Sequence, residues 1–88
     1  MNSVKDRTVT VWTDGERPLR MFWQDRRWRV SDTPTGIYGE SDFIHPLLTH
    51  APVVRIGWRF QVTDEDGESL VVDAIQDDGQ WVIAKTYS

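Results

Sequence analysis

The chain of 88 residues has no cysteine and few alanines, methionines or lysines, and these shortages narrow the kinds of protein that it can be. Without cysteine there is no disulfide, no thiolate metal site and no cysteine nucleophile. No segment approaches the roughly 20 successive apolar residues that a membrane helix needs, so we expect no membrane partner. Residues 1–7 lack the hydrophobic run of a secretory signal, and the sequence therefore predicts a cytoplasmic protein.

Residues that favour strands are abundant instead. The chain has five tryptophans, three phenylalanines and two tyrosines, and it is rich in valine. β-Branched and aromatic side chains fit the half-buried faces of a sheet, and the length suits one hydrophobic core. We therefore expect an all-β protein with one domain over residues 8–88, preceded by a disordered N-terminus over residues 1–7.

Apolar and polar residues alternate in several segments, which is the pattern of half-buried strands. The six predicted strands are 8–13, 19–24, 27–31, 53–62, 69–76 and 81–87. Short turns separate most of them, and Asp14-Gly15 and Asp78-Gly79 carry the Asp-Gly pair that tight hairpins favour. Gln24-Asp25 is a weaker turn signal because it lacks glycine. The sequence predicts an antiparallel meander of about six strands that curls into a small SH3-like or half-open barrel.

The alternation also predicts which side chains face the core. On the second and third strands these are Leu19, Met21, Trp23, Trp28 and Val30. On the long strand 53–62 they are Val54, Ile56, Trp58, Phe60 and Val62, and Gly57 marks a bend or bulge. For the last strand two faces stay open, with either Trp81 and Ile83 or Val82 and Ala84 turned inward.

Residues 31–52 interrupt the strand pattern with prolines and glycines, so we expect one long irregular connection there. Connections of this length in a compact domain are often functional. Its apolar residues Phe43, Leu47 and Leu48 are candidates for an interface with another protein or with a second copy of the chain. The alternative is that the segment only caps the open end of the barrel.

The net charge of −4 is unevenly distributed along the chain. Residues 1–30 carry seven basic and four acidic side chains, whereas residues 31–88 carry three basic and ten acidic ones. The overall acidity argues against a protein that coats nucleic acid by bulk attraction, because that attraction grows with the number of phosphates neutralised. A local basic face remains compatible with it.

Arginine gathers on the predicted outer faces of three strands. If the core assignments hold, Arg20, Phe22, Arg27 and Arg29 point away from the core. Arg55 and Arg59 take the corresponding positions on strand 53–62 and join them if the strands are neighbours. An arginine-rich surface with an aromatic ring, Phe22 or Trp12, can hold phosphates and stack bases. In the alternative, the arginine stems cover aromatic rings and the guanidinium groups pair with carboxylates of adjacent strands.

No catalytic or metal-binding pattern is present in the sequence. His45 and His50 lie five positions apart in the irregular segment, without cysteine or an acidic residue at helical spacing. Residues 64–69 faintly resemble a calcium loop, but glycine comes too early and Ile75 stands where the loop needs glutamate. We expect no enzyme activity, no metal and no cofactor.

The segments 11–12, 17–23 and 27–30, followed by 58–62 and the closing Asp-Gly-x-Trp strand, resemble a family of short bacterial proteins of unknown function. That family opens with an Arg-Pro-x-Arg-Phe-x-Trp pattern and later has a Trp-x-Val strand. Here the opening reads Arg17-Pro18-Leu19-Arg20-Met21-Phe22-Trp23, and residues 31–52 do not match. The resemblance implies a bacterial origin and a link to DNA repair, and its motif consists of packing residues without a known activity.

Two functions from different classes stay open. The first is a non-enzymatic module for protein–protein interaction or assembly, through the irregular segment or an exposed strand edge. The alternative is a module that binds single-stranded nucleic acid through the arginine and aromatic side chains.

Overall fold

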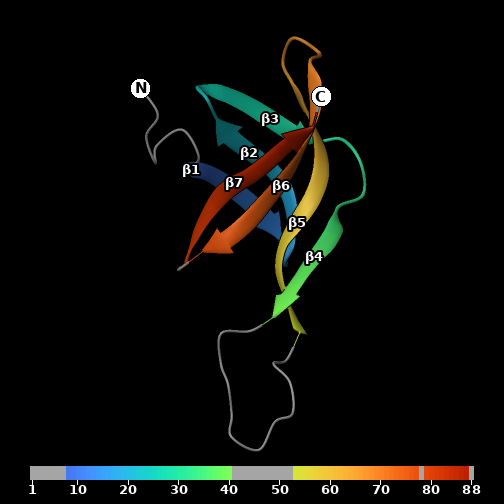
Figure 1. Ribbon diagram of the computed structural model, residues 1–88. Coiled ribbons are helices and arrows are strands. Elements are labelled where there is room, and N and C mark those ends of the chain that lie inside the picture. Colours follow the sequence, from blue (N-terminus) through green and yellow to red (C-terminus); the bar gives the residue numbers. More distant parts are fainter. Residues whose placement is uncertain (1–7, 41–52, 78, 88) are drawn as a thin grey trace, which may run out of the picture.

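The computed structural model describes residues 8–40, 53–77 and 79–87 and shows an antiparallel β-structure (Figure 1). Its seven strands are β1 (Thr8–Asp14), β2 (Arg17–Trp23), β3 (Arg26–Val30), β4 (Thr35–Glu40), β5 (Val53–Asp64), β6 (Ser69–Asp77) and β7 (Gln80–Tyr87). Within these described ranges no helix is long and apolar enough to cross a membrane. The prediction of an all-β fold is confirmed.

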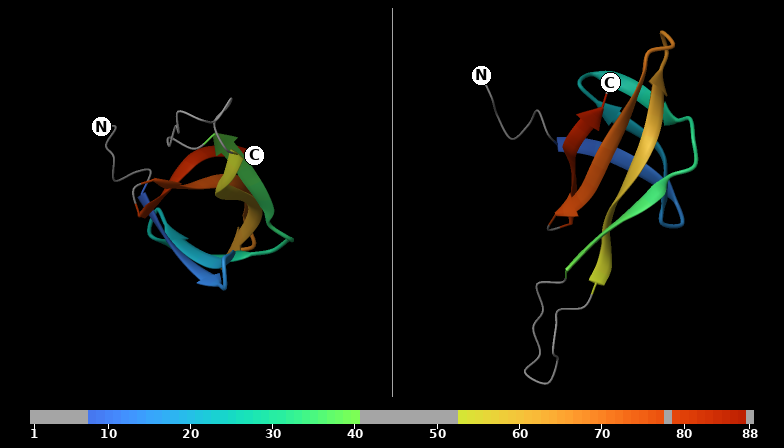
Figure 2. Two further views of the ribbon diagram at one scale, coloured as in Figure 1. Left: turned by 90° about the horizontal axis from the view of Figure 1, so that it is seen from below. Right: turned by 45° about the vertical axis from the view of Figure 1, so that its right-hand side comes forward.

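Six strands close into a barrel because β5 is long enough to serve two neighbours on one edge. The strand order is β3-β2-β1-β7-β6-β5-β4, and an additional pairing joins β3 to β5. One edge of β5 pairs with β6; the other pairs with β4 near its start and with β3 near its end. The view along the barrel in Figure 2 shows the resulting ring, with β4 as an extra strand outside it.

The existence of β4 corrects part of the prediction of one long irregular connection over residues 31–52. Thr35–Glu40 has two glycines and only two apolar residues, so its sequence carries almost no strand signal. Its pairing comes from β5, whose first residues extend past the end of β6 and need a partner on the other edge. The remainder of the predicted connection, residues 41–52, lies outside the described residues, as do residues 1–7.

The hairpin between β2 and β3 forms without glycine. Gln24 and Asp25 both have positive φ values, 55° and 61°, which is the backbone of a type I′ turn. Such a turn matches the right-handed twist of the strands it joins. It places Trp23 opposite Arg26 and Met21 opposite Trp28, so the two tryptophans come to the same side of the sheet.

In the described part of the chain, the hydrophobic core of the barrel consists of nine buried side chains: Val9, Met21, Trp23, Trp28, Phe60, Val62, Val72, Ala74 and Ile83. The Trp28 indole Nε1 donates a hydrogen bond to the Trp23 carbonyl at 3.1 Å, which satisfies the polar atom of a ring that is almost fully buried. Trp81 packs against this cluster beside Ile83. The open choice for the last strand is thereby decided in favour of Trp81 and Ile83.

Three predicted core residues, Leu19, Val54 and Ile56, lie outside the core cluster. Leu19 is 55% exposed, because the pairing of β1 with β2 steps from Arg20 directly to Pro18 and leaves Leu19 in a bulge. Pro18 is buried instead. Val54 is also exposed, because the ladder with β6 begins only at Gly57 and the strand before it extends beyond the barrel. A bulge leaves Ile56 unpaired with β4. These errors arise because strict alternation applies only where a strand keeps its register and its place in the barrel wall.

Candidate functional site

The outer side of β1, β2 and β3 carries five exposed side chains that we call the arginine–aromatic face: Trp12, Arg20, Phe22, Arg27 and Arg29. The strand register places them side by side. Trp12 lies opposite Arg20, which in turn lies opposite Arg29, and Phe22 lies opposite Arg27. Directly opposed residues on one face have side chains in contact range. Sequence alternation predicted four members of this face, and the strand register places them next to one another: Arg20, Phe22, Arg27 and Arg29.

Two large rings on this face are open to solvent. Trp12 is 45% exposed and Phe22 is 40% exposed. The Arg20 guanidinium lies over the Trp12 ring, 5.2 Å from its centroid, in a cation–π contact. This contact holds the Trp12 ring against β2 while leaving much of its surface accessible, so a planar ligand can approach it.

The three arginines of the face make no ion pair with any carboxylate in the described part of the chain. The carboxylates that form ion pairs are bound to other arginines: Asp64 and Glu68 to Arg26, Glu16 to Arg55, and Asp73 to Arg59. The alternative to a free arginine surface, in which carboxylates pair with the arginines, thus applies to Arg55 and Arg59 and not to Arg20, Arg27 and Arg29.

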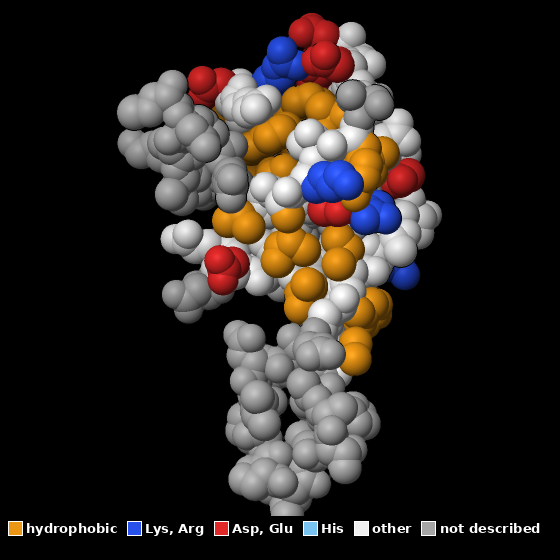
Figure 3. All heavy atoms as spheres, viewed as in Figure 1, with side chains coloured by type: hydrophobic (Ala, Val, Ile, Leu, Met, Phe, Trp, Pro, Cys, Tyr) orange, Lys and Arg blue, Asp and Glu red, His pale blue; other side chains and the backbone are white. Residues whose placement is uncertain are grey.

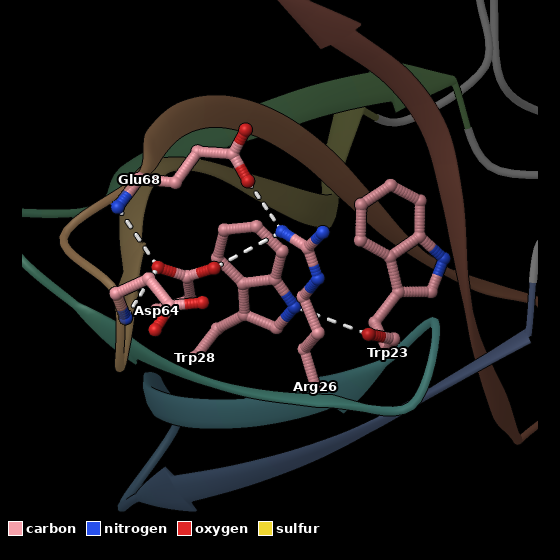
Figure 4. Close-up of polar contacts among 6 residues, drawn as sticks. Trp23, Arg26, Trp28, Asp64 and Glu68 are labelled. Carbon is pink, nitrogen blue, oxygen red and sulfur yellow. Dashed lines mark hydrogen bonds and ion pairs between the residues drawn. The ribbon is translucent and has the colours of Figure 1, made fainter.

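Asp64 lies next to the face but its carboxylate is already occupied (Figure 4). Oδ1 accepts hydrogen bonds from the backbone N–H groups of Asp66 at 3.0 Å and Glu68 at 2.8 Å. Oδ2 accepts one from Arg26 Nη1 at 3.0 Å, and the same nitrogen also contacts Glu68. Hydrogen bonding to Glu68, with its charge and that of Asp64, raises the pKa of Arg26. Asp64 therefore closes the hairpin loop between β5 and β6 and anchors it to β3.

Two adjoining hollows make a groove across the face. The first has a cavity volume of about 320 Å³ and is lined by Trp12, Arg20, Met21, Phe22, Arg27 and Trp28. The second, of about 210 Å³, is lined by Arg20, Arg27, Trp28, Arg29, Thr63, Asp64 and Glu65. The hollows share Arg20, Arg27 and Trp28, so they lie next to each other. The volume of the first lies in the range of small-molecule sites.

Arg59 belongs to a different surface from the one predicted. It lies on the outer side of β5–β7, where Figure 3 shows basic and acidic side chains together. Its Nε and Nη2 donate to the two carboxylate oxygens of Asp73 at 2.7 and 3.1 Å, and the Tyr87 hydroxyl donates to Asp73 at 2.8 Å. The bond from Arg59, assisted by that from Tyr87, lowers the pKa of Asp73. This cluster ties β7 to β5 across β6.

Arg55 is also displaced from the predicted face. The pairing of β4 with β5 steps from Gly57 to Arg55 and leaves Ile56 unpaired, which is a bulge next to the glycine where one was expected. The bulge brings Arg55 to the side of Trp58, with its guanidinium 4.6 Å from the centroid of that ring. Arg55 pairs with Glu16 at 2.9 Å and lines a hollow with Val11 and Trp81. Gly57 itself is required, since a Cβ there would lie 2.2 Å from the Ala74 carbonyl oxygen.

Six residues of the groove were not among the predicted binding residues, and two of these, Trp12 and Glu65, have exposed side chains. Trp12 carried a signal, because alternation in residues 8–13 puts it opposite Val9 and Val11. No sequence pattern pointed to Glu65, because only the pairing of β3 with β5 brings its loop beside Arg29. The predicted interface residues Phe43, Leu47 and Leu48 lie outside the described residues, as do His45 and His50. Among residues that are described, no group of three metal-ligating side chains is found.

Comparison with known proteins leaves the geometry as the basis for function. No family model, no curated protein and no solved structure matches this chain. The resemblance to a short bacterial family stays a prediction.

Proposed function

We propose that the chain is a non-enzymatic module that binds single-stranded nucleic acid through its arginine–aromatic face. The observation that carries this proposal is the absence of carboxylate partners for Arg20, Arg27 and Arg29 within the described residues, on a face that also exposes two rings. Guanidinium groups left unneutralised on a surface favour an anionic ligand. The exposed rings add an affinity for planar groups.

Single strands suit this face better than a duplex. An unpaired strand can turn its bases toward Trp12 and Phe22 while its phosphates reach the arginines, and each base stacked on an aromatic ring contributes about 1–3 kcal/mol. A duplex keeps its bases stacked on one another, so it would leave the two rings without a role. Small barrels that bind single strands combine the same elements, a positive groove and stacking platforms.

The negative net charge is compatible with this proposal because several carboxylates are neutralised by arginines outside the face: Asp64 and Glu68 by Arg26, Glu16 by Arg55, and Asp73 by Arg59. The hairpin loop after β5 does bring acidic residues to the second hollow, but Asp64 there is already paired with Arg26. Screening by physiological salt limits the reach of these charges to about 8 Å. The arginines therefore act locally, and we expect affinity to be moderate and strongly dependent on salt.

The direct test is a titration of labelled oligothymidylate, eight nucleotides long, followed by fluorescence anisotropy at 50 and 200 mM salt. With three phosphate contacts the logarithmic salt slope is about −2, so the dissociation constant should rise roughly 20-fold between the two conditions. Replacing Arg20, Arg27 and Arg29 together by glutamine should abolish this dependence. Trp12→Ala should weaken binding at least fivefold with the salt slope unchanged, because it removes stacking and no charge.

A matched control is available in Arg17. This exposed arginine also has no ion-pair partner among the described residues, but it lines a separate hollow near the β1–β2 turn with Asp14 and Leu19. Arg17→Gln removes the same charge without touching the face, so it should change affinity less than twofold. If Arg17→Gln reduced the affinity as much as Arg20→Gln, Arg27→Gln or Arg29→Gln does, the binding would be non-specific attraction and the proposal would be wrong.

Protein–protein interaction remains a second proposal, supported by a different observation. Tyr38 and Val53 are 62% and 66% exposed and, with Val54, form an apolar end on the β4–β5 ribbon that extends from the barrel (Figure 2). Exposed apolar side chains grouped at a strand end are typical of surfaces that associate. Self-association through this ribbon is the form of the proposal that the described residues support.

A further inference from the structure

The second hollow of the groove contains opposite charges that do not meet. Arg20, Arg27 and Arg29 line it, and so does Glu65. Within the described part of the chain Glu65 forms no ion pair and its carboxylate has no hydrogen-bond partner. Attraction would otherwise bring such groups together, so the hollow presents a free acceptor and free donors across about 210 Å³ of space.

Glu65 is the only acceptor of the hollow with this freedom among the described side chains. Both oxygens of Asp64 are engaged by Arg26 and by backbone N–H groups. The Thr63 hydroxyl is bonded to Ser31 and Ser69. A ligand in the hollow can thus meet both a carboxylate that accepts two hydrogen bonds and guanidinium groups that donate pairs of them.

Guanine is the base whose hydrogen-bonding groups match this arrangement on both sides. Its N1–H and N2–H groups are adjacent donors, which a carboxylate receives in a bidentate pair. Its O6 and N7 are adjacent acceptors, which arginine contacts in a bidentate pair. Adenine and cytosine can use one donor group toward Glu65, and thymine has a single imino N–H between two carbonyls.

We infer that the second hollow is a subsite for one unstacked guanine, read by Glu65 on its N1/N2 edge and by Arg29 or its neighbours on its O6/N7 edge. The inference rests on the proposed function, in which the adjoining strand lies over Trp12 and Phe22. It adds sequence preference to a surface that otherwise holds any single strand.

The test measures the affinities of five DNA heptamers by competition with a labelled oligothymidylate. Each heptamer has thymine at the six outer positions and guanine, hypoxanthine, adenine, cytosine or thymine at the central one. The guanine heptamer should bind about tenfold more tightly than the all-thymine one. Hypoxanthine lacks only the N2 amino group of guanine, so it should bind with intermediate affinity.

Two variants of the hairpin loop separate base readout from charge. Glu65→Gln replaces one of the two acceptor oxygens by an NH2 donor, so the bidentate contact with N1–H and N2–H is lost and the guanine preference should fall to less than twofold even if all heptamers bind more tightly. Asp66→Asn removes the same charge from the neighbouring exposed residue and should leave the preference intact.

The outcomes distinguish this inference from the proposed function. Salt-dependent binding of all five heptamers with equal affinity would overturn the guanine subsite and leave single-strand binding in place. A guanine preference that survives Glu65→Gln would overturn the assignment of Glu65. Failure of every heptamer to bind would overturn both.

Discussion

At the scale of single residues, the structure separates arginines that look alike in the sequence. Arg20, Arg27 and Arg29 have no carboxylate partner in the described chain, whereas Arg26, Arg55 and Arg59 are each held by one or more. The difference depends on the cross-strand neighbour, because a side chain on a sheet interacts first with residues directly opposite or diagonal to it. Asp73 lies opposite Arg59, while Arg20 lies opposite Trp12 and Arg29.

The Arg59–Asp73 pair predicts a pH dependence of stability. The pKa of Asp73 is lowered below its ordinary value of 3.8, mainly by the hydrogen bond from Arg59. A carboxyl group with a lowered folded-state pKa contributes stability above its unfolded-state value, and this contribution is lost as the pH falls through the lower folded-state value. Asp73→Asn should therefore lower the free energy of unfolding at pH 7. The difference from the original chain should shrink as the pH falls below 3.8.

Urea unfolding followed by tryptophan fluorescence at pH 7, 4 and 3 measures this difference. Asp66→Asn serves as the control because the Asp66 side chain is exposed and accepts no hydrogen bond from another described residue. A destabilisation by Asp73→Asn that is equal at all three pH values would show that the residue acts by packing rather than by its charge.

At the scale of the element, two turns hold β1, β2 and β3 in the register that assembles the arginine–aromatic face. The β2–β3 turn uses Gln24 and Asp25 at positive φ, where residues other than glycine are strained. The β1–β2 turn uses Gly15 at φ 67°, and a Cβ added there would meet no atom within 4 Å. The β2–β3 turn is therefore strained, whereas the β1–β2 turn avoids strain because glycine occupies its positive-φ position.

These turns predict stability changes of opposite sign. Gln24→Asn combined with Asp25→Gly introduces the pair that type I′ turns prefer, and should raise the free energy of unfolding by about 1 kcal/mol. Gly15→Ala should lower it by about 1 kcal/mol, because the cost is confined to the backbone. Urea midpoints at constant m-value measure both. A loss of stability in the first variant would contradict the assignment of a type I′ turn.

At the scale of the whole molecule, the extension of β5 beyond the barrel creates the β4–β5 ribbon and its apolar end. If this end is a contact between copies of the chain, the original protein should elute in size-exclusion chromatography with light scattering as a dimer at about 100 μM, and Tyr38→Lys with Val53→Lys should return it to a monomer. Leu19→Lys replaces a similarly exposed apolar residue of the barrel and should leave the dimer intact. A monomer at every concentration would refute self-association.

The sequence by itself determined the all-β fold, most of the core and four members of the arginine–aromatic face. Alternation is a local property of a strand. The pairing of β2 with β3 has no register shift, so Trp23 and Trp28 turn inward while Arg20 and Arg27 turn outward. The same rule failed at Leu19 and Arg55, where bulges shift the alternation. Bulges depend on the neighbouring strand, which the segment's own sequence does not encode.

Only the tertiary structure decided which arginines are free, that β4 exists, and that Glu65 shares a hollow with Arg29. Each of these depends on pairing between strands distant in sequence, above all on β5, which receives β3 and β4 along one edge. Such pairing is set by closure of the barrel as a whole, because the free energy that selects it comes from burying the common core rather than from any one segment.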